Sequence, residues 1–243
     1  MPGDAASAVP ALRQALAAGV EERALARLAR DPQITRRLEQ FTRALEKAPD
    51  LKAALRDPRV LGVVLPALGL ADGVSQPGLA LRALTADPKD KAGLLARLPD
   101  RRWKSAAEAL NLAERGIAAL RDPKVQARLA EGLRRVTWQG ELDAGQPGLS
   151  DAMLFRERAA NAKTAYDVLG DPVLRRVVTG ALGLPQQMAV QPVETQARAI
   201  ASRVDIAKLQ NPREVAKLAE RYVVAAASSG STAPTSWLAG LLA

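Results

Sequence analysis

The 243-residue sequence contains no histidine and no cysteine. Their absence excludes histidine-based acid–base catalysis, Ser-His and Cys-His nucleophile systems, disulfide bonds and the common zinc sites. Carboxylates, lysine and tyrosine could still act chemically, but no glycine-rich phosphate loop, calcium-binding loop or nucleophile elbow groups them. We therefore expect no catalytic residues, no metal site and no cofactor, and we predict that the protein is not an enzyme.

Aromatic residues are also scarce, at 3% of the chain, whereas hydrophobic residues make up 48%. A core must therefore consist mainly of leucine, valine and alanine. Apolar residues recur every three or four positions through nearly the whole sequence, and no stretch alternates as a half-buried strand does. This pattern predicts an all-α protein.

Long hydrophobic runs are missing as well. The longest, residues 60–71, is interrupted by Gly62, Pro66 and Gly69 and is shorter than the ~20 residues needed to span a bilayer. The first ten residues lack the basic-then-apolar order of a secretion signal. We expect no membrane span, and either a cytoplasmic location or export by a route that needs no cleaved signal.

One apolar segment is present twice. Residues 55–70 (LRDPRVLGVVLPALGL) and 169–184 (LGDPVLRRVVTGALGL) agree at nine of sixteen positions when they are aligned at a spacing of 114 residues. Each begins with Asp-Pro, which starts a helix because Asp caps free backbone N–H groups and Pro needs no donor there. Each ends with Gly-Leu, which stops a helix because Gly adopts a left-handed conformation. We therefore predict a duplicated helix, whose first copy is buried on nearly all sides.

Pro66 lies inside this first copy and has no N–H to donate to the carbonyl of Gly62, so we expect a kink or a loosened turn there. Five Asp-Pro pairs in all predict helix starts. For these aspartates we weigh helix capping over a metal-binding or acid–base role at roughly ten to one. The pairs begin at residues 31, 57, 87, 122 and 171.

These signals divide the chain into two tandem copies of a four- to five-helix unit packed together. The expected parts are a lead-in with weak helices over residues 1–30, a first repeat over 31–120, a second over 122–227, and a tether with an apolar tail over 228–243. The second repeat is expected to contain an insertion near 138–160.

Three local features follow from the same reasoning. Asp87-Pro88 is expected to open a short helix that reaches Leu98, and residues 101–120 are expected to form one long helix. The insertion is expected to begin with a loop, WQGELDAGQPG, because glycine and proline interrupt it, and Ser150 is expected to cap the next helix.

Charge points to a class of partner. The formal net charge is +9, which favours an acidic partner such as nucleic acid or anionic lipid, although a merely soluble, arginine-rich surface is the simpler interpretation. Arg101, Arg102, Trp103 and Lys104 form the best candidate for nucleic-acid contact. Trp103, however, lies on the apolar face of its helix, which favours a core position. The two arginines oppose the helix dipole, so we expect a nearby carboxylate or an acidic partner.

The C-terminal tail is the candidate protein-binding segment. Trp237, Leu238, Leu241 and Leu242 fall on one side of a short helix that follows the tether SSGSTAPTS. A tethered helix of this kind enters a groove on a partner or folds back onto its own chain, and both alternatives stay open.

The spacing of these motifs resembles a bacterial family of uncharacterised, mostly helical proteins that are often encoded among flagellar genes. The chain has alanine and leucine where that family is richer in phenylalanine and tyrosine. The matching pieces are Asp31-Pro32, Asp57-Pro58-Arg59-Val60, Ala67-Leu68-Gly69-Leu70, Arg82, Asp87-Pro88 and residues 95–103, with a second, weaker form in the other half.

The resemblance implies a flagellum-associated role and supplies no catalytic residue. Our first hypothesis is therefore a non-enzymatic accessory or assembly protein with a flagellar component as its protein partner. Arg101 and Arg102 and the four apolar tail residues would be its contacts. The alternative is a basic helical module that binds nucleic acid or another polyanion.

Overall fold

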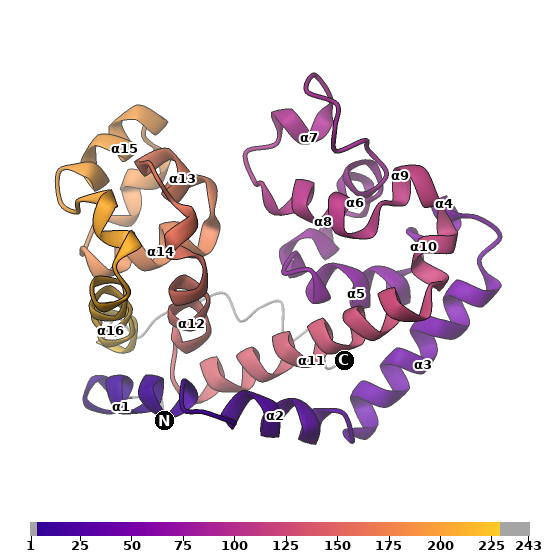
Figure 1. Ribbon diagram of the computed structural model, residues 1–243, viewed down its shortest axis with the longest axis horizontal. Helices are drawn as coiled ribbons and strands as arrows, with labels where there is room; N and C mark the ends of the chain where they lie inside the picture. Colours follow the sequence, from indigo (N-terminus) through magenta and orange to yellow (C-terminus); the bar gives the residue numbers. More distant parts are fainter. Residues whose placement is uncertain (1–3, 229–243) are drawn as a thin grey trace. The chain divides into compact units, whose positions relative to one another are not determined.

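The computed structural model describes residues 4–228, and this part of the chain is all-α with no strand (Figure 1). The predicted fold class is therefore confirmed. The described chain forms two compact units. Unit 1 contains residues 4–21 and 139–228, and unit 2 contains residues 22–138. Both boundaries fall inside helices, α2 (Val20–Leu28) and α11 (Pro123–Gly145), so each of these helices contributes residues to both units.

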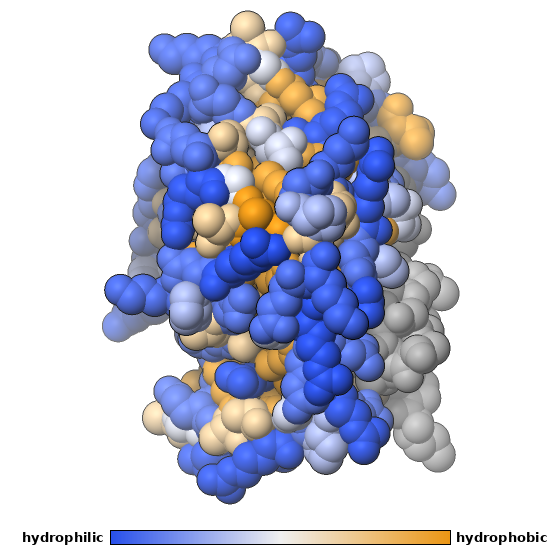
Figure 2. Space-filling model, turned by 90° about the vertical axis from the view of Figure 1, so that its right-hand side faces the viewer, coloured by the Kyte–Doolittle hydropathy of each residue, from blue (hydrophilic) through white to orange (hydrophobic). Residues whose placement is uncertain are grey.

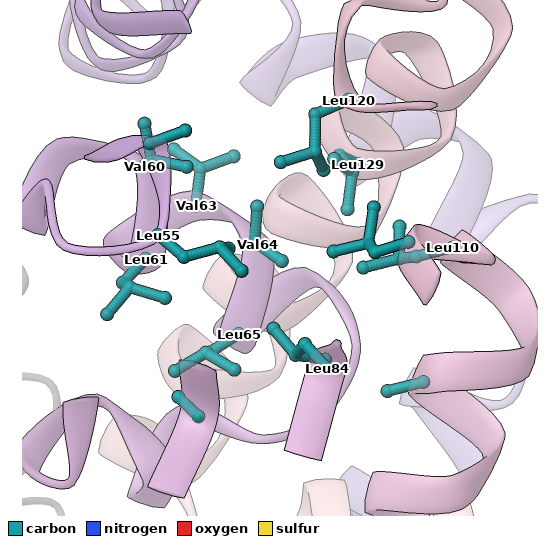
Figure 3. Packing of buried hydrophobic residues seen from close by; sticks show 14 of the residues in the cluster. Leu55, Val60, Leu61, Val63, Val64, Leu65, Leu84, Leu110, Leu120 and Leu129 are labelled. Atoms are coloured by element: carbon teal, nitrogen blue, oxygen red, sulfur yellow. The ribbon is translucent and has the colours of Figure 1, made fainter. Parts of the chain in front are cut away.

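Unit 2 is built around α5, the first copy of the duplicated segment. Its Val60, Val63 and Val64 have no exposed surface, and they point toward leucines from the surrounding helices (Figure 3). The prediction of a centrally buried helix is thus confirmed. Besides parts of α2 and α11, the elements of unit 2 are α3 (Pro32–Lys47), α4 (Leu51–Ala54), α5 (Pro58–Ala67), the 3-10 helix η1 (Ala71–Ser75), α6 (Pro77–Leu84), α7 (Leu94–Arg97), α8 (Arg102–Leu110), α9 (Leu112–Arg115) and α10 (Ile117–Arg121).

Unit 1 is built around its last helix, which packs against α1, α12 and α14. The first helix of the chain therefore belongs to the same core as the final one. The elements of this unit are α1 (Ala5–Ala15), the end of α11, α12 (Leu149–Arg158), η2 (Ala159–Asn161), α13 (Ala165–Gly170), α14 (Pro172–Ala181), η3 (Gln186–Val190), α15 (Val193–Ala201), η4 (Ile206–Gln210) and α16 (Pro212–Ser228).

The two Gly-Leu stops have the same geometry. Gly69 and Gly183 adopt positive φ angles of 73° and 62°. The N–H of Leu70 donates to the carbonyl of Leu65 at 2.8 Å, and the N–H of Leu184 donates to Thr179 at 2.9 Å. Each stop satisfies carbonyls that the helix end would otherwise leave free. The predicted stops are confirmed, whereas the tandem repeat and its boundaries stay a prediction.

Asp-Pro starts are confirmed at four helices. Backbone N–H groups in the first turns of α3, α5, α11 and α14 donate to the side chains of Asp31, Asp57, Asp122 and Asp171. Asp87-Pro88 does not open a helix, because residues 87–92 form turns and α7 begins only after Gly93. Asp87 and Asp90 each accept a backbone N–H two residues ahead, and this local bonding competes with a helix.

Two predictions about the middle of the chain are wrong. The long helix over residues 101–120 is broken at Asn111 and Gly116, whose φ angles of 50° and 59° are left-handed. The side chain of Asn111 donates to Glu114 at 2.9 Å, which supports the first break.

The expected loop at Trp138 is instead helical as far as Gly145. Trp138 and Gly140 are buried, so tertiary packing outweighs the low helix propensity of glycine. Ser150 is not a cap either, because α12 starts at Leu149 and the Ser150 hydroxyl donates to Asp143.

Candidate partner-binding surfaces

Arg102 is held inside unit 2 by several bonds. Its guanidinium donates to the Asp100 carboxylate at 2.7 Å, to Asp72 at 2.9 Å and to the carbonyl of Gly69 at 2.5 Å. Burial by itself lowers the pKa of Arg102, but the two carboxylates raise it above its ordinary value. The expected nearby carboxylate is therefore present, and Arg102 ties the start of α8 to the stop of α5.

The neighbours of Arg102 divide between core and surface. Trp103 is buried, and its ring lies so close to Gly73 that a Cβ there would be 2.7 Å from the ring. The predicted core position of Trp103 is confirmed. Arg101 and Lys104 are exposed. The other predicted contacts, Trp237, Leu238, Leu241 and Leu242, lie outside the described residues.

Unit 1 contains a polar cluster that the sequence did not suggest. Arg176 of α14 donates two bonds of 2.7 Å to the Asp151 carboxylate of α12, and the Tyr222 hydroxyl of α16 donates to Asp151 at 3.0 Å. Burial, together with Asp151, raises the pKa of Tyr222 well above its ordinary value. Its ring fits because Gly148 and Gly180 have no side chains, since a Cβ at either glycine would lie within 3.0 Å of it.

Asp143, near the end of α11, belongs to the same cluster. It accepts bonds from the hydroxyl of Ser150 and from its backbone N–H, the latter at 2.9 Å. Burial raises the pKa of Asp143 to about 6, although the Ser150 bonds lower it. Beside it the Gln146 amide oxygen accepts from Ser7 of α1 at 3.3 Å.

This cluster joins helices rather than presenting reactive groups. Asp151 already accepts from Arg176 and Tyr222, and the raised pKa of Tyr222 keeps its hydroxyl protonated. Within residues 4–228 no three carboxylates gather where they could hold a metal ion. The cluster residues lie on α11, α12, α14 and α16. Because α14 and α16 are far from α12 in the sequence, residue spacing does not predict the contacts of Asp151.

An arginine-lined depression lies on unit 2 at the end of α2. Arg23, Arg27 and Arg30 are all exposed and line it together with Ala26 and Asp31. Arg23 and Arg27 lie one turn apart on α2, and Arg30 follows in the turn after the helix ends at Leu28. We call these three residues the arginine stripe. The spacing of these arginines is visible in the sequence, although the hydrophobic pattern of this region predicts only a weak helix.

A second depression lies between α3 and α11. Its lining combines Leu38 with threonine, glutamate and arginine side chains, among them Arg134, whose Nε atom has no hydrogen-bond partner within residues 4–228. Figure 2 shows the side of the molecule that carries α3, α4 and α10, where hydrophilic side chains surround a band of hydrophobic ones. This face is thus mixed in character.

The sequence profile of a family described as "Protein of unknown function (DUF1217)" matches residues 67–215, which is more than half of the chain. The chain belongs to the DUF1217 family. The matched span runs from the end of α5 in unit 2 to the start of α16 in unit 1, so the DUF1217 region includes parts of both units. The arginine stripe lies before it.

A crystal structure of a protein from Agrobacterium tumefaciens has the same fold as this DUF1217 protein. The two chains are 24% identical and superpose with a TM-score of 0.72, over 93% of this chain and 95% of the other. No curated protein matches the sequence. Within residues 4–228, none of the DUF1217 protein's helices combines the length and the apolar character needed to cross a membrane.

Proposed function

We propose that this DUF1217 protein is a non-enzymatic, flagellum-associated accessory or assembly protein that acts through protein–protein contacts. The observation that carries the contact role is the exposed arginine stripe on α2 and the turn that follows it. The flagellar setting is supported by the motif resemblance alone. In the proposal the protein works in the cytoplasm, or reaches the flagellum by export without a cleaved signal.

The geometry of the stripe supports a macromolecular partner over a small ligand. Pockets for small molecules are concave and mostly apolar, and they enclose most of the ligand. The depression on α2 is open instead, and its lining is three exposed arginines with one alanine and one aspartate. Arginine is also among the residues enriched at protein interfaces.

The proposal is tested by crosslinking capture from motile, flagellated cells. The baits are the full chain, a chain that ends at Ser229, and the full chain with Arg23→Gln, Arg27→Gln and Arg30→Gln. We expect the full chain to capture flagellar components and the triple variant to lose them. Loss with the shortened chain would place the contact in the Trp237–Leu242 tail. Recovery of no flagellar component by any bait would refute the flagellar role.

A second candidate function is binding of nucleic acid or another polyanion, favoured by the net charge of +9 and by the same stripe. Such binding neutralises several phosphates and weakens steeply as salt rises. A gel-shift titration with duplex and single-stranded DNA at low and moderate salt decides it. Binding that is absent, or that does not change with salt, would exclude this candidate.

A further inference from the structure

The net charge of the protein lies entirely on unit 2. Residues 22–138 contain 23 lysines and arginines and 14 aspartates and glutamates, a difference of +9 that equals the formal net charge of the whole chain. The rest of the sequence contains 12 residues of each sign and has no net charge. Even if every carboxylate of unit 2 paired with a cation, nine cations would have no partner inside the unit. Charge therefore makes unit 2, and not unit 1, the part of the protein that attracts an acidic partner.

Part of this excess gathers where α3 ends and α11 begins. The guanidinium of Arg121, at the end of α10, donates to the carbonyls of Leu45 and Ala48 at 2.9 Å and 2.7 Å, and so joins residues 44–59 to residues 115–128. Figure 1 shows the end of α3, α4, α10 and the start of α11 at one end of unit 2, and Figure 2 looks onto this side. The two segments contain eight cations, all of them exposed, and four carboxylates. We call the exposed side chains of residues 44–59 and 115–128 the basic face.

Three of the four carboxylates on the basic face already serve the fold. Asp50, Asp57 and Asp122 accept backbone N–H groups at the starts of α4, α5 and α11. Asp57 also pairs with Arg59 at 2.6 Å, and Asp122 pairs with Arg115 at 2.8 Å. These two ion pairs use two of the eight cations, so six cations have no carboxylate partner.

The fold uses little of this remaining charge. Arg121 bonds to backbone carbonyls, and the side chains of the other five cations make no hydrogen bond or ion pair within residues 4–228. The five are Lys47, Lys52, Arg56, Lys124 and Arg128. The helix dipole favours Lys47, in the last turn of α3, but opposes Lys124 in the first turn of α11. Glu46, the fourth carboxylate, offsets a single charge, so the basic face stays strongly positive.

Apolar side chains accompany these cations. Ala48, Leu51 and Ile117 are half-buried, since they pack against the core of unit 2 and keep part of their surface exposed. Ile117 precedes Arg121 by four residues and Leu51 follows Ala48 by three, so both lie within about one helical turn of the Arg121–Ala48 bond along the chain. Interfaces between proteins combine apolar surface with a polar rim, and the basic face offers both.

We propose that the basic face is the docking surface for an acidic surface of a partner protein. The inference rests on the proposed role in protein–protein contacts and adds a surface to it. Charge complementarity of this kind steers the partner toward unit 2 and raises the rate of association. Carboxylates of the partner meet the five unpaired cations, and its apolar side chains cover Leu51 and Ile117.

The aromatic residues of unit 2 favour a protein partner over single-stranded nucleic acid. Proteins that bind single strands stack the bases on exposed aromatic rings. The aromatic residues of segment 22–138 are Phe41, Trp103 and Trp138, and all three are buried. The basic face therefore offers positive charge without a ring on which a base could stack.

Binding of a designed helical peptide to the full chain tests the proposal. The acidic probe carries glutamates on both sides of a leucine stripe, and the control probe carries glutamines in their place. Fluorescence anisotropy gives the affinity at low and moderate salt. The face variant carries Lys47→Gln, Arg56→Gln, Lys124→Gln and Arg128→Gln. The matched control variant removes the same charge from exposed positions of unit 1, through Arg156→Gln, Arg175→Gln, Arg213→Gln and Arg221→Gln.

We expect the face variant to bind the acidic peptide about tenfold more weakly, and the control variant to change affinity by less than about twofold. Binding by the wild-type chain should weaken as salt rises, because the contacts are exposed. Two half variants, Lys47→Gln with Arg56→Gln and Lys124→Gln with Arg128→Gln, should each lose about threefold. They provide the readout if the fourfold variant is poorly folded.

Three results would overturn the proposal. They are no binding of the acidic peptide, equal binding of the glutamine peptide, and equal loss in the face and control variants. DNA that binds more tightly than the peptide and is released by the face changes would assign the surface to nucleic acid instead.

The face variant, used as a further bait in the crosslinking capture, separates this inference from the proposed function. Peptide binding that depends on the basic face, with no flagellar component captured by any bait, would refute only the flagellar setting. Capture of flagellar components by the face variant at the level of the full chain would refute this docking surface and leave the proposed function intact.

Discussion

At the scale of single residues, Arg37 supplies the hydrogen bond to the Gly62 carbonyl that Pro66 cannot supply. Pro66 has no N–H for the carbonyl of Gly62, four residues earlier, and the guanidinium of Arg37 from α3 donates to that carbonyl at 2.5 Å. The sequence correctly located the conflict at Gly62. It could not supply the solution, because Arg37 lies 25 residues away and belongs to another helix.

A double-mutant cycle measures this compensation. Arg37→Met should lower the free energy of unfolding by about 1–2 kcal/mol, because it removes the donor to the half-buried carbonyl of Gly62. In a Pro66→Ala background the new N–H can bond to Gly62, so the same change should cost less than half as much. Urea denaturation of the four proteins checks this. Equal costs in both backgrounds would show that Arg37 does not serve the Gly62 carbonyl.

Asp143 should make the protein more stable as the pH falls toward 4. Its pKa is about 6 in the folded chain and near 3.8 in the unfolded chain, so between these values the folded state binds more protons. The gain is about 2 kcal/mol, less than the full shift implies because Asp143 is partly exposed. Asp143→Asn should abolish this gain and be at least as stable as wild type at pH 7.5.

The control for the pH dependence of Asp143 is a change at the neighbouring carboxylate of Asp151. Asp151→Asn should cost about 2 kcal/mol at pH 7.5, because Arg176 and Tyr222 lose their charged acceptor. Asp57 and Asp122, whose pKa values are lowered by Arg59 and Arg115, oppose the trend. The informative quantity is therefore the difference between wild type and Asp143→Asn, measured by urea denaturation from pH 7.5 to 4. Parallel curves would contradict the assignment.

At the scale of elements, α11 packs against the end of α5 through a glycine. A Cβ at Gly132 would lie 2.4 Å from the carbonyl oxygen of Ala67, which is backbone and cannot move aside easily. Gly132→Ala should therefore destabilise the protein by about 2 kcal/mol or more, although alanine is the better helix former. Gly145→Ala on the same helix meets no atom within 4 Å and should stay within about 1 kcal/mol of wild type. Thermal unfolding followed by circular dichroism compares the two. Equal effects would show that the α5–α11 contact is not limiting.

The helix starts and stops that could be predicted from the sequence are those determined by neighbouring residues in the chain. The Asp-Pro starts at Asp31 and Asp171 and the stop at Gly69 were correct because one turn of backbone determines them. The helix through Trp138 was missed because burial in the folded protein outweighs two glycines. The polar cluster at Asp151 could not be predicted because the partners of Asp151, Arg176 and Tyr222, lie on other helices.

At the scale of the whole molecule, the tryptophans and tyrosines of the described residues divide between the two units. Trp103 and Trp138 belong to unit 2, and both tyrosines, Tyr166 and Tyr222, belong to unit 1. With the third tryptophan removed by Trp237→Phe, tryptophan emission reports unit 2 alone. Emission and far-ultraviolet circular dichroism can then be followed together during urea unfolding.

We expect Asp151→Asn, a change in unit 1, to lower the unfolding midpoint equally by tryptophan emission and by circular dichroism. The reason is that α11 contributes residues to both units, so unfolding of one disturbs a helix of the other. The matched control is the same pair of measurements on the Trp237→Phe chain without the unit 1 change. An unchanged emission midpoint beside a lowered dichroism midpoint would instead show that the units unfold independently.

The place of α1 has a consequence for synthesis on the ribosome. Its buried Leu12 and the ion pair of Arg13 with Glu220 join the first helix to α16, the last element of the described chain. At about 5–20 residues per second, α1 waits roughly 10–40 seconds for α16 to be translated. Residues 22–138 emerge in the meantime and can complete most of unit 2. The nascent chain therefore carries an apolar helix with no permanent partner through most of its own translation, which makes α1 a natural target for a ribosome-associated chaperone.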